Sequence, residues 1–263
     1  MRKVFVQSLG CRASQADGAA LESALEANGF EPAQSAQEAD LVVLNTCTVT
    51  NAADADARRI VRNLSRDHPG VEIAVTGCYA QRAPEELAVL PGVRWVIGNS
   101  HKTSLAQIVA DSSGQESEEY HGQIFRTDFA RGSQFLATPV RDIRPDRTRP
   151  NLKIQDGCGN RCSFCIIPAV RGPSRSAPLD SVIEQVSDLA RRYAEVVLSG
   201  INLGRWGRDL PGRWCFSDLL RALLDKTSVG RLRISSVEPM DWSDDLLDLV
   251  ASEERIASVV STN

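Results

Sequence analysis

Short apolar runs alternate with helix-like stretches along almost the whole chain, and this alternation constrains the fold more than any other feature. In the first part of the chain we predict strands at 3–7, 40–45, 72–76 and 94–97, with helices at 19–28 and 51–68 between them. Strands that alternate with helices form parallel sheets with right-handed crossovers. We therefore predict an α/β fold that begins with an open parallel-sheet N-terminal domain at residues 1–110.

A second β/α pattern follows a polar stretch in the middle of the chain. Residues 111–123 are acidic and polar, and residues 126–150 are rich in Arg and Pro, so we predict a linker at 111–150. Beyond it, strands are expected at 152–155, 195–199, 231–235 and 256–262, and helices at 178–193, after Ser217 and after Ser243. These elements predict a second α/β domain at 151–263.

Charge and hydropathy exclude several classes of protein. The chain has 30 Lys and Arg against 34 Asp and Glu, a formal charge of −4, so it is not a globally basic nucleic-acid binder. No apolar run approaches the roughly 18 residues of a membrane-spanning helix, and the N-terminus leads into a strand rather than a signal sequence. We expect a cytoplasmic protein that does not contact a membrane.

Cysteines carry the strongest chemical signal. Seven are present, and an odd number without an export signal predicts metal binding or catalysis rather than disulfides. Cys158, Cys162 and Cys165 form C-x-x-x-C-x-x-C, which lets one loop wrap a single metal centre. Structural zinc sites and simple ferredoxin clusters use four ligands, so three thiolates predict a four-iron cluster with one open iron. The alternatives are a zinc loop completed by a distant His or Cys, and three unrelated thiols.

Three further cysteines each lie just past a predicted strand. These are Cys11, Cys47 and Cys78. Because parallel strands end at the same edge of a sheet, where ligands usually bind, we expect the three thiols to converge there. They predict a second iron–sulfur cluster with an open iron. Buried structural cysteines are common, and they are the alternative.

The short-spaced loop resembles the signature of the radical S-adenosylmethionine (SAM) enzymes, and with the second triad it is similar to the radical SAM methylthiotransferases. The resemblance covers essentially residues 1–255 and is strongest at 45–53, 76–81 and 158–172. It implies two [4Fe-4S] clusters, one on each triad, with S-adenosyl-L-methionine as cofactor. It also implies insertion of sulfur into a C–H bond followed by methylation, and a partial, incomplete radical SAM β/α barrel at 151–263.

Within this family, Thr-Val-Thr-Asn after Cys47 and Tyr-Ala-Gln after Cys78 are most similar to the branch acting on C2 of N6-threonylcarbamoyladenosine 37 in tRNA. Sibling branches act on isopentenyladenosine in tRNA or on an aspartate of a ribosomal protein, and both stay open. The resemblance implies the tRNA anticodon stem-loop as partner and an electron donor such as flavodoxin or ferredoxin. Two hypotheses from other classes also stay open: an electron-transfer protein and a non-enzymatic, metal-stabilised RNA-binding fragment.

The resemblance also assigns cofactor-binding roles to three residues. Gly200 and Asn202 follow a predicted strand, where relatives contact the methionine part of SAM. Arg171 lies where relatives place basic residues that face SAM or substrate. Phe164 is expected to shield the cluster or face the adenine, and Cys215 is expected to be an inert thiol. We assign no residue a catalytic role.

A local excess of positive charge surrounds the short-spaced loop. Its ten members are Arg126, Arg131, Arg141, Arg144, Arg147, Arg149, Lys153, Arg161, Arg171 and Arg175. They predict a strip that contacts phosphates, the alternative being an ordinary solvated surface. Relatives continue into six β/α units and a C-terminal RNA-binding barrel, so we expect this chain to be C-terminally truncated; such a chain need not be active alone.

Overall fold

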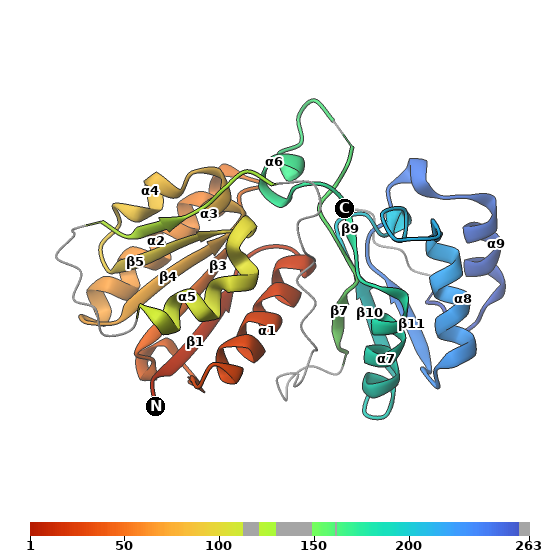
Figure 1. Cartoon of the computed structure of the whole chain (residues 1–263), viewed down its shortest axis with the longest axis horizontal. Coiled ribbons are helices and arrows are strands. Elements are labelled where there is room, and N and C mark those ends of the chain that lie inside the picture. The colour runs from red at the N-terminus through yellow and green to blue at the C-terminus, as the bar shows by residue number, and fades with distance from the viewer. Residues whose placement is uncertain (113–120, 130–148, 161, 258–263) are drawn as a thin grey trace. The chain divides into compact units, whose positions relative to one another are not determined.

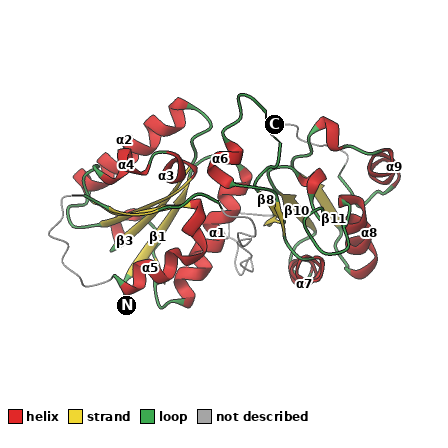
Figure 2. Ribbon diagram, turned by 45° about the horizontal axis from the view of Figure 1, so that its top comes forward, coloured by secondary structure: helices red, strands yellow, loops and turns green. Residues whose placement is uncertain are grey.

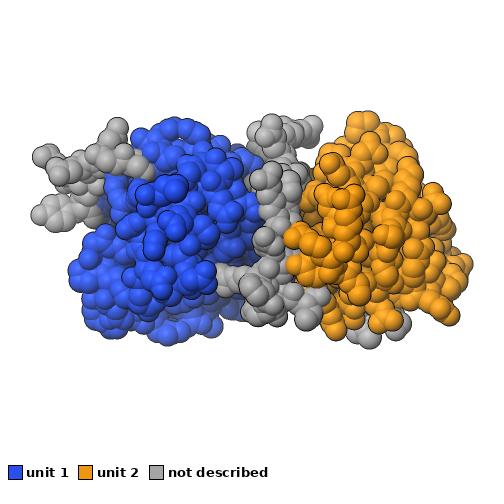
Figure 3. Space-filling model, turned by 90° about the horizontal axis from the view of Figure 1, so that it is seen from below, with its two compact units in different colours: residues 1–138, 161–172 blue, residues 139–160, 173–263 orange. Residues whose placement is uncertain are grey.

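The chain divides into two compact units in a computed structural model, which describes residues 1–112, 121–129, 149–160 and 162–257. Unit 1 comprises residues 1–138 and 161–172, and unit 2 comprises residues 139–160 and 173–263 (Figure 3). The division differs from the predicted boundaries because residues 161–172 pack with the N-terminal elements. Among the described residues, no helix is long and apolar enough to cross a membrane.

In the described part of the chain, unit 1 is built on a six-stranded parallel sheet with the order β2-β1-β3-β4-β5-β6 (Figure 1). Its strands are β1 (Lys3–Ser8), β2 (Glu31–Pro32), β3 (Leu41–Thr46), β4 (Glu72–Gly77), β5 (Val93–Gly98) and β6 (Gln123–Phe125). The chain adds β2 on one side of β1 and the later strands on the other, so the order reverses between β1 and β3. Ligands of such sheets bind outside the carboxyl ends of the strands at this reversal.

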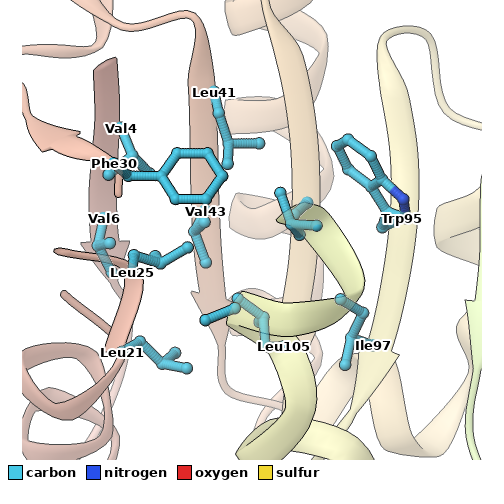
Figure 4. Close-up of a cluster of buried hydrophobic side chains, with 13 residues drawn as sticks. Val4, Val6, Leu21, Leu25, Phe30, Leu41, Val43, Trp95, Ile97 and Leu105 are labelled. Carbon is cyan, nitrogen blue, oxygen red and sulfur yellow. The ribbon is translucent and has the colours of Figure 1, made fainter. Parts of the chain in front are cut away.

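Helices cover both faces of this sheet (Figure 2). The helices of unit 1 are α1 (Arg12–Ala27), α2 (Asn51–Asp67), α3 (Cys78–Arg82), α4 (Pro84–Ala88) and α5 (Leu105–Asp111), with short 3₁₀ turns η1 (Ala36–Glu38) and η2 (Asn99–Ser104). A further short helix, α6 (Ile167–Arg171), contacts α3 and η2. On one face Leu25 of α1 and Leu105 of α5 join Val43 in a buried cluster (Figure 4). On the other face Val61 of α2 and Leu87 of α4 belong to a second cluster. The sheet is therefore covered by an apolar layer on each face.

The first helix begins earlier than predicted. The periodicity of the apolar residues indicated a helix at 19–28, whereas α1 starts at Arg12 and ends at Ala27. The buried residues in its first turns are small, such as Ala13 and Ala16, so the sequence shows no periodic pattern of large apolar side chains there. By contrast, α2 begins at Asn51 as predicted, and Thr50 caps it with a hydroxyl that accepts a hydrogen bond from the Ala53 N–H at 3.1 Å.

Part of the predicted linker belongs to the sheet. Residues 123–125 form β6, which pairs in parallel with Trp95–Ile97 of β5. A strand of three residues at a sheet edge, with Ile124 43% exposed, is too short to show a recognisable alternation in the sequence. Within the Arg- and Pro-rich stretch at 126–150, residues 130–148 lie outside the described residues.

Unit 2 contains a parallel sheet with the order β11-β10-β7 and a two-stranded antiparallel pair, β8 and β9. The strands are β7 (Asn151–Lys153), β8 (Gln155–Asp156), β9 (Arg175–Ser176), β10 (Glu195–Ser199) and β11 (Arg231–Ile234). The helices are α7 (Leu179–Ala190), α8 (Phe216–Lys226) and α9 (Asp244–Ser252), with 3₁₀ turns η3 (Leu203–Arg205) and η4 (Pro239–Asp241). Chain order and spatial order agree, as in successive β/α units.

Beside β11, residues 255–257 begin one further pairing. Ile256 forms a parallel bridge with Leu232, and the Ala257 N–H donates to the Leu232 carbonyl at 2.8 Å. This is the start of the strand predicted at 256–262, of which 258–262 lies outside the described residues. The α/β class with parallel sheets is confirmed, and the partial barrel stays a prediction.

Candidate functional site

Three neighbouring strands of unit 1 end at cysteines. Cys47 and Cys78 directly follow β3 and β4, whose last residues, Thr46 and Gly77, are partners in the sheet. Cys11 comes shortly after β1, at the cap of α1. Because β1 and β3 flank the reversal of strand order, the topology delivers these cysteines to the edge where such sheets bind ligands.

The backbone around these cysteines is closely packed. Gly10 has a φ of +96°, and a Cβ at this position would lie 2.5 Å from the Cβ of Cys47 and 3.0 Å from its Sγ. Gly77 has a φ of +100°, and its Cβ would lie 2.3 Å from the carbonyl oxygen of Thr46. Side chains rarely adopt such backbone angles, so both positions require glycine. The glycines let three chain segments approach one another at the sheet edge.

The thiol of Cys47 is influenced by both other cysteines. Burial raises the pKa of Cys47, the neighbouring thiols of Cys78 and Cys11 raise it further, and the backbone N–H groups of Val49 and Thr48 act in the opposite direction by hydrogen bonding to the sulfur. N–H groups directed at a sulfur stabilise a thiolate ligand and tune a metal centre.

Side chains also contact the other two sulfurs. The amide Nδ2 of Asn99 donates to Cys78 Sγ at 3.5 Å, and the Ser14 hydroxyl lies 3.6 Å from Cys11 Sγ. Two buried oxygens from this edge of the sheet, Thr76 Oγ1 and Asn99 Oδ1, have no hydrogen-bond partner among the described residues.

The chemistry of these donors is that of an iron–sulfur site. Thiolates are the ligands of [4Fe-4S] clusters, and hydrogen-bond donors lie beside the sulfurs of Cys11, Cys47 and Cys78. Among the described residues, no group of three or more His, Cys, Asp or Glu side chains is arranged to hold one metal ion. Binding of a cluster by these three cysteines stays a prediction.

A buried ion-pair network lies close to the first cysteine. Lys102 Nζ and Arg171 Nη2 both donate to Asp17 Oδ2, at 3.0 and 3.2 Å, and all three side chains are at most 5% exposed. Arg171 also donates to Ser14 Oγ at 3.1 Å, and Lys102 to Asn45 Oδ1 at 3.1 Å. Sequence patterns did not identify Asp17, Lys102, Ser14 or Asn99, because distant polar residues of this kind carry no local motif.

The three cysteines of the C-x-x-x-C-x-x-C motif do not all belong to the same unit. Cys158 belongs to unit 2, whereas Cys162 and Cys165 belong to unit 1. The Cys165 N–H donates to the Cys162 carbonyl at 3.1 Å, which closes a turn between these two residues. Cys162 is exposed and Cys165 is half-buried. Phe164, expected to shield a cofactor, is 91% exposed in this structure.

Gln155, which the sequence did not single out, organises the predicted SAM loop of unit 2. Its Oε1 accepts hydrogen bonds from the N–H groups of Ile201 and Asn202, both at 2.9 Å. Its Nε2 donates to the Gly157 carbonyl at 2.8 Å and to Ser174 Oγ at 2.9 Å. Gln155 is completely buried. The residue before Cys158 and the loop at 200–202 are therefore fastened to one carboxamide.

The predicted cofactor residues of this loop are packed inside unit 2. A Cβ at Gly200 would lie 2.8 Å from the side chain of Leu203. Asn202 is fully buried, donates through Nδ2 to Asp241 at 2.6 Å and accepts a bond from the Glu238 N–H at 3.3 Å. Burial alone would raise the pKa of Asp241, but hydrogen bonds from Asn202 and Arg205 and the charges of Arg205 and Arg208 together outweigh it, so the pKa lies below its ordinary value. Direct contacts of Gly200, Asn202 or Arg171 with SAM stay predictions.

The predicted phosphate-contacting strip is only partly on the surface. Lys153 and Arg171 are buried in ion pairs with Asp156 and Asp17, so these two cannot contact a phosphate in this structure. Arg126 is exposed and pairs with Asp128, whereas the members at 131–147 and at 161 lie outside the described residues. Separately, Cys215 caps α8 through a reciprocal capping box.

Comparison with known proteins shows what the whole chain is similar to. Residues 3–98 match the uncharacterized protein family UPF0004. The chain is 36% identical to the threonylcarbamoyladenosine tRNA methylthiotransferase MtaB of Aquifex aeolicus over 97% of this chain and 61% of that protein. It is also 36% identical to MtaB of Bacillus subtilis, over 98% of this chain and 56% of that protein.

More distant relatives share the same extent of alignment. A tRNA-2-methylthio-N(6)-dimethylallyladenosine synthase of Desulforamulus reducens is 29% identical over 96% of this chain and 55% of its own length. In fold, the chain is similar to the radical SAM methyltransferase TsrM of Kitasatospora setae, with a TM-score of 0.63 and 16% identity over 95% of this chain and 57% of that one. The chain spans 55–61% of the length of these curated relatives. The chain therefore matches the UPF0004 family model over residues 3–98 and is similar, over nearly all its residues, to proteins named as tRNA methylthiotransferases.

Proposed function

We propose that this chain forms the N-terminal and radical SAM parts of a methylthiotransferase that acts on N6-threonylcarbamoyladenosine in tRNA. The observation that carries the proposal is the delivery of Cys11, Cys47 and Cys78 to one sheet edge at the reversal of strand order. The names of the relatives with 36% identity support the substrate. The 29% identical relative, named for dimethylallyladenosine, makes a sibling substrate the second candidate.

The two triads have separate roles in this proposal. Cys11, Cys47 and Cys78 would hold the auxiliary cluster, and Cys158, Cys162 and Cys165 would hold the cluster that binds SAM. Two [4Fe-4S] clusters and SAM would supply the radical, sulfur and methyl chemistry. The chain's own residues bind and orient these groups: Gly10 and Gly77 allow the close approach of the cysteine segments, and backbone N–H groups at 48 and 49 support the Cys47 sulfur.

The loop that follows β10 provides the second part of the proposal. Gly200 and Asn202 would lie beside the methionine part of SAM, with Gln155 holding the backbone at 201 and 202 in place. Arg171, fixed by Asp17, would contribute through its position in the network. Completion of the β/α barrel, a flavodoxin- or ferredoxin-type electron donor, binding of the anticodon stem-loop and a cytoplasmic location belong to the same proposal.

Metal analysis after anaerobic reconstitution tests the cofactor assignment. We expect about eight irons per chain, from two four-iron clusters, and about four after alanine replacement of either triad. Cys215→Ala is the matched control and should keep the full iron content. Zinc without iron would support the RNA-binding fragment instead, and clusters that do not respond to SAM would support an electron-transfer protein.

Product analysis then tests the reaction and the substrate. With dithionite and SAM, a loaded chain should release 5′-deoxyadenosine, and the release should disappear when Cys158, Cys162 and Cys165 are replaced. For the substrate, tRNA nucleosides are compared by mass spectrometry between a deletion strain and the same strain carrying the full-length gene. Recovery of the 2-methylthio form of isopentenyladenosine, without that of threonylcarbamoyladenosine, would move the chain to the sibling branch.

A further inference from the structure

The segment at 161–172 connects the two sets of cysteines within unit 1. It carries Cys162 and Cys165 and ends in α6, which contacts α3 and η2 of the N-terminal domain. Val170 and Arg171 are each only 1% exposed. The segment therefore packs as part of unit 1, and two side chains of unit 1, Asn99 and Ser14, form hydrogen bonds with its C-terminal end.

Asn99 makes the first polar connection. Its Nδ2 donates to the carbonyl oxygen of Val170 at 2.7 Å and to Cys78 Sγ at 3.5 Å. One amide group with two N–H bonds can serve both acceptors at once. Asn99 thus ties a cysteine of the N-terminal triad directly to the backbone of α6.

Ser14 makes the second connection in the same way. Its hydroxyl accepts a hydrogen bond from Arg171 Nη2 at 3.1 Å and lies 3.6 Å from Cys11 Sγ. Arg171 is held in turn by Asp17 at 3.2 Å. Two independent side chains, on η2 and α1, therefore have the same arrangement: one contact with an N-terminal cysteine and one with the end of the segment at 161–172.

We propose that Ser14 and Asn99 are positioning residues through which occupation of the N-terminal cysteines orders the segment that carries Cys162 and Cys165. A hydrogen bond to a charged sulfur is stronger than one to a neutral thiol, so binding of a cluster fixes the two donors. The fixed donors then hold Val170 and Arg171 in place. Coupling of this kind is reciprocal, so an ordered segment in turn favours occupation of the N-terminal triad. The inference rests on the proposed function only in assigning a cluster to Cys11, Cys47 and Cys78.

Hydrogen exchange of the segment at 161–172, followed by mass spectrometry, tests the coupling. The full chain with Cys158→Ala is used, because this change weakens the second cluster site without altering the segment itself. Reconstitution with iron and sulfide should slow exchange of the segment by at least roughly 2- to 10-fold, the range that a single hydrogen bond supplies. In the double variant Ser14→Ala/Asn99→Leu the slowing should disappear.

Matched controls separate the connection from general loss of hydrogen bonds. Asn28 donates to the Ala24 carbonyl at 2.8 Å and Ser112 to the Ile108 carbonyl at 2.8 Å. Asn28→Ala and Ser112→Ala should both retain the parental response. Asn99→Asp keeps the shape of the side chain but removes both donors, so it should behave like Asn99→Leu if the hydrogen bonds, rather than packing, carry the effect.

Two results would overturn the inference. One is iron loading without a change in exchange at 161–172 in the parent chain, and the other is full retention of the change in the double variant. Failure of the proposed function is seen separately, as absence of iron and sulfide from the Cys158→Ala chain. In that case the contact between Asn99 and the Val170 carbonyl is tested in the iron-free chain. Asn99→Leu should accelerate hydrogen exchange at 161–172 relative to Asn28→Ala, and equal exchange rates in the two variants would refute that contact.

Discussion

Replacement of Gln155 by leucine should loosen the loop predicted to bind SAM. The change removes the acceptor of the Ile201 and Asn202 N–H groups, both 2.9 Å from Oε1, in a part of unit 2 where Gln155 and Asn202 are fully buried. A buried donor left without a partner costs about 1–3 kcal/mol. Two such donors give about 2–6 kcal/mol, a large fraction of the roughly 5–15 kcal/mol that stabilises a typical domain.

Amide exchange resolved at single residues measures this cost where it arises. Since each 1.4 kcal/mol is a factor of ten, the Ile201 and Asn202 amides should exchange at least about 30-fold faster in Gln155→Leu. Gln155→Glu keeps an acceptor oxygen and should leave these two amides protected. Gln107→Leu, at an exposed glutamine of α5, is the control and should change nothing in unit 2. Acceleration of less than about threefold in Gln155→Leu would refute the assigned role of the carboxamide.

Three further changes test other parts of the structure. Gly10→Ala should destabilise unit 1 by at least about 1–3 kcal/mol, because φ is +96° and the new Cβ would meet Cys47 at 2.5 Å; thermal unfolding measures this, and an unchanged midpoint would contradict the close approach. Asp17→Asn should cost about 3–5 kcal/mol in urea unfolding, since a carboxylate that pairs with two buried cations is lost; a cost below 1 kcal/mol would show that the network is not stabilising. A hydrogen bond from Arg221 lowers the pKa of Asp245 from 3.8 to about 2, so the contribution of this pair to stability is complete above pH 4 and is lost as the pH falls toward 2. Asp245→Asn should therefore reduce the pH dependence of the melting temperature between pH 4 and pH 2. An unaltered profile would exclude the pair as the source of that dependence.

Much of the parallel sheet could be predicted because its central strands are continuous apolar runs. β3 and β4 are buried on both faces, and such strands are distinctive in sequence. The two outermost strands could not be predicted, because β2 and β6 are only two and three residues long and their side chains are mostly exposed. The early start of α1 was missed because small residues pack well without an apolar periodicity.

Some features of the candidate site could likewise be predicted from the sequence, and others could not. The location of Cys11, Cys47 and Cys78 just after β1, β3 and β4, on the same side of the sheet, follows from strand direction alone, so it could be predicted before any coordinates. The network of Asp17, Lys102 and Arg171 could not, because charged residues are normally exposed and their burial depends on tertiary partners far away in the chain. Gln155 was missed for a related reason: a lone glutamine at a strand end has no recognisable pattern until its five hydrogen bonds are seen.

In the proposed function, the dispersal of one triad over three strands determines when the chain can acquire iron. Cys11, Cys47 and Cys78 meet only after β1, β3 and β4 have paired, a process dominated by contacts between distant parts of the chain and therefore slow. The other three cysteines are neighbours in sequence and can capture iron in a largely unstructured polypeptide. A newly synthesised chain is thus expected to fill the local loop first, and loading of the strand-end cysteines would report that the first sheet is complete.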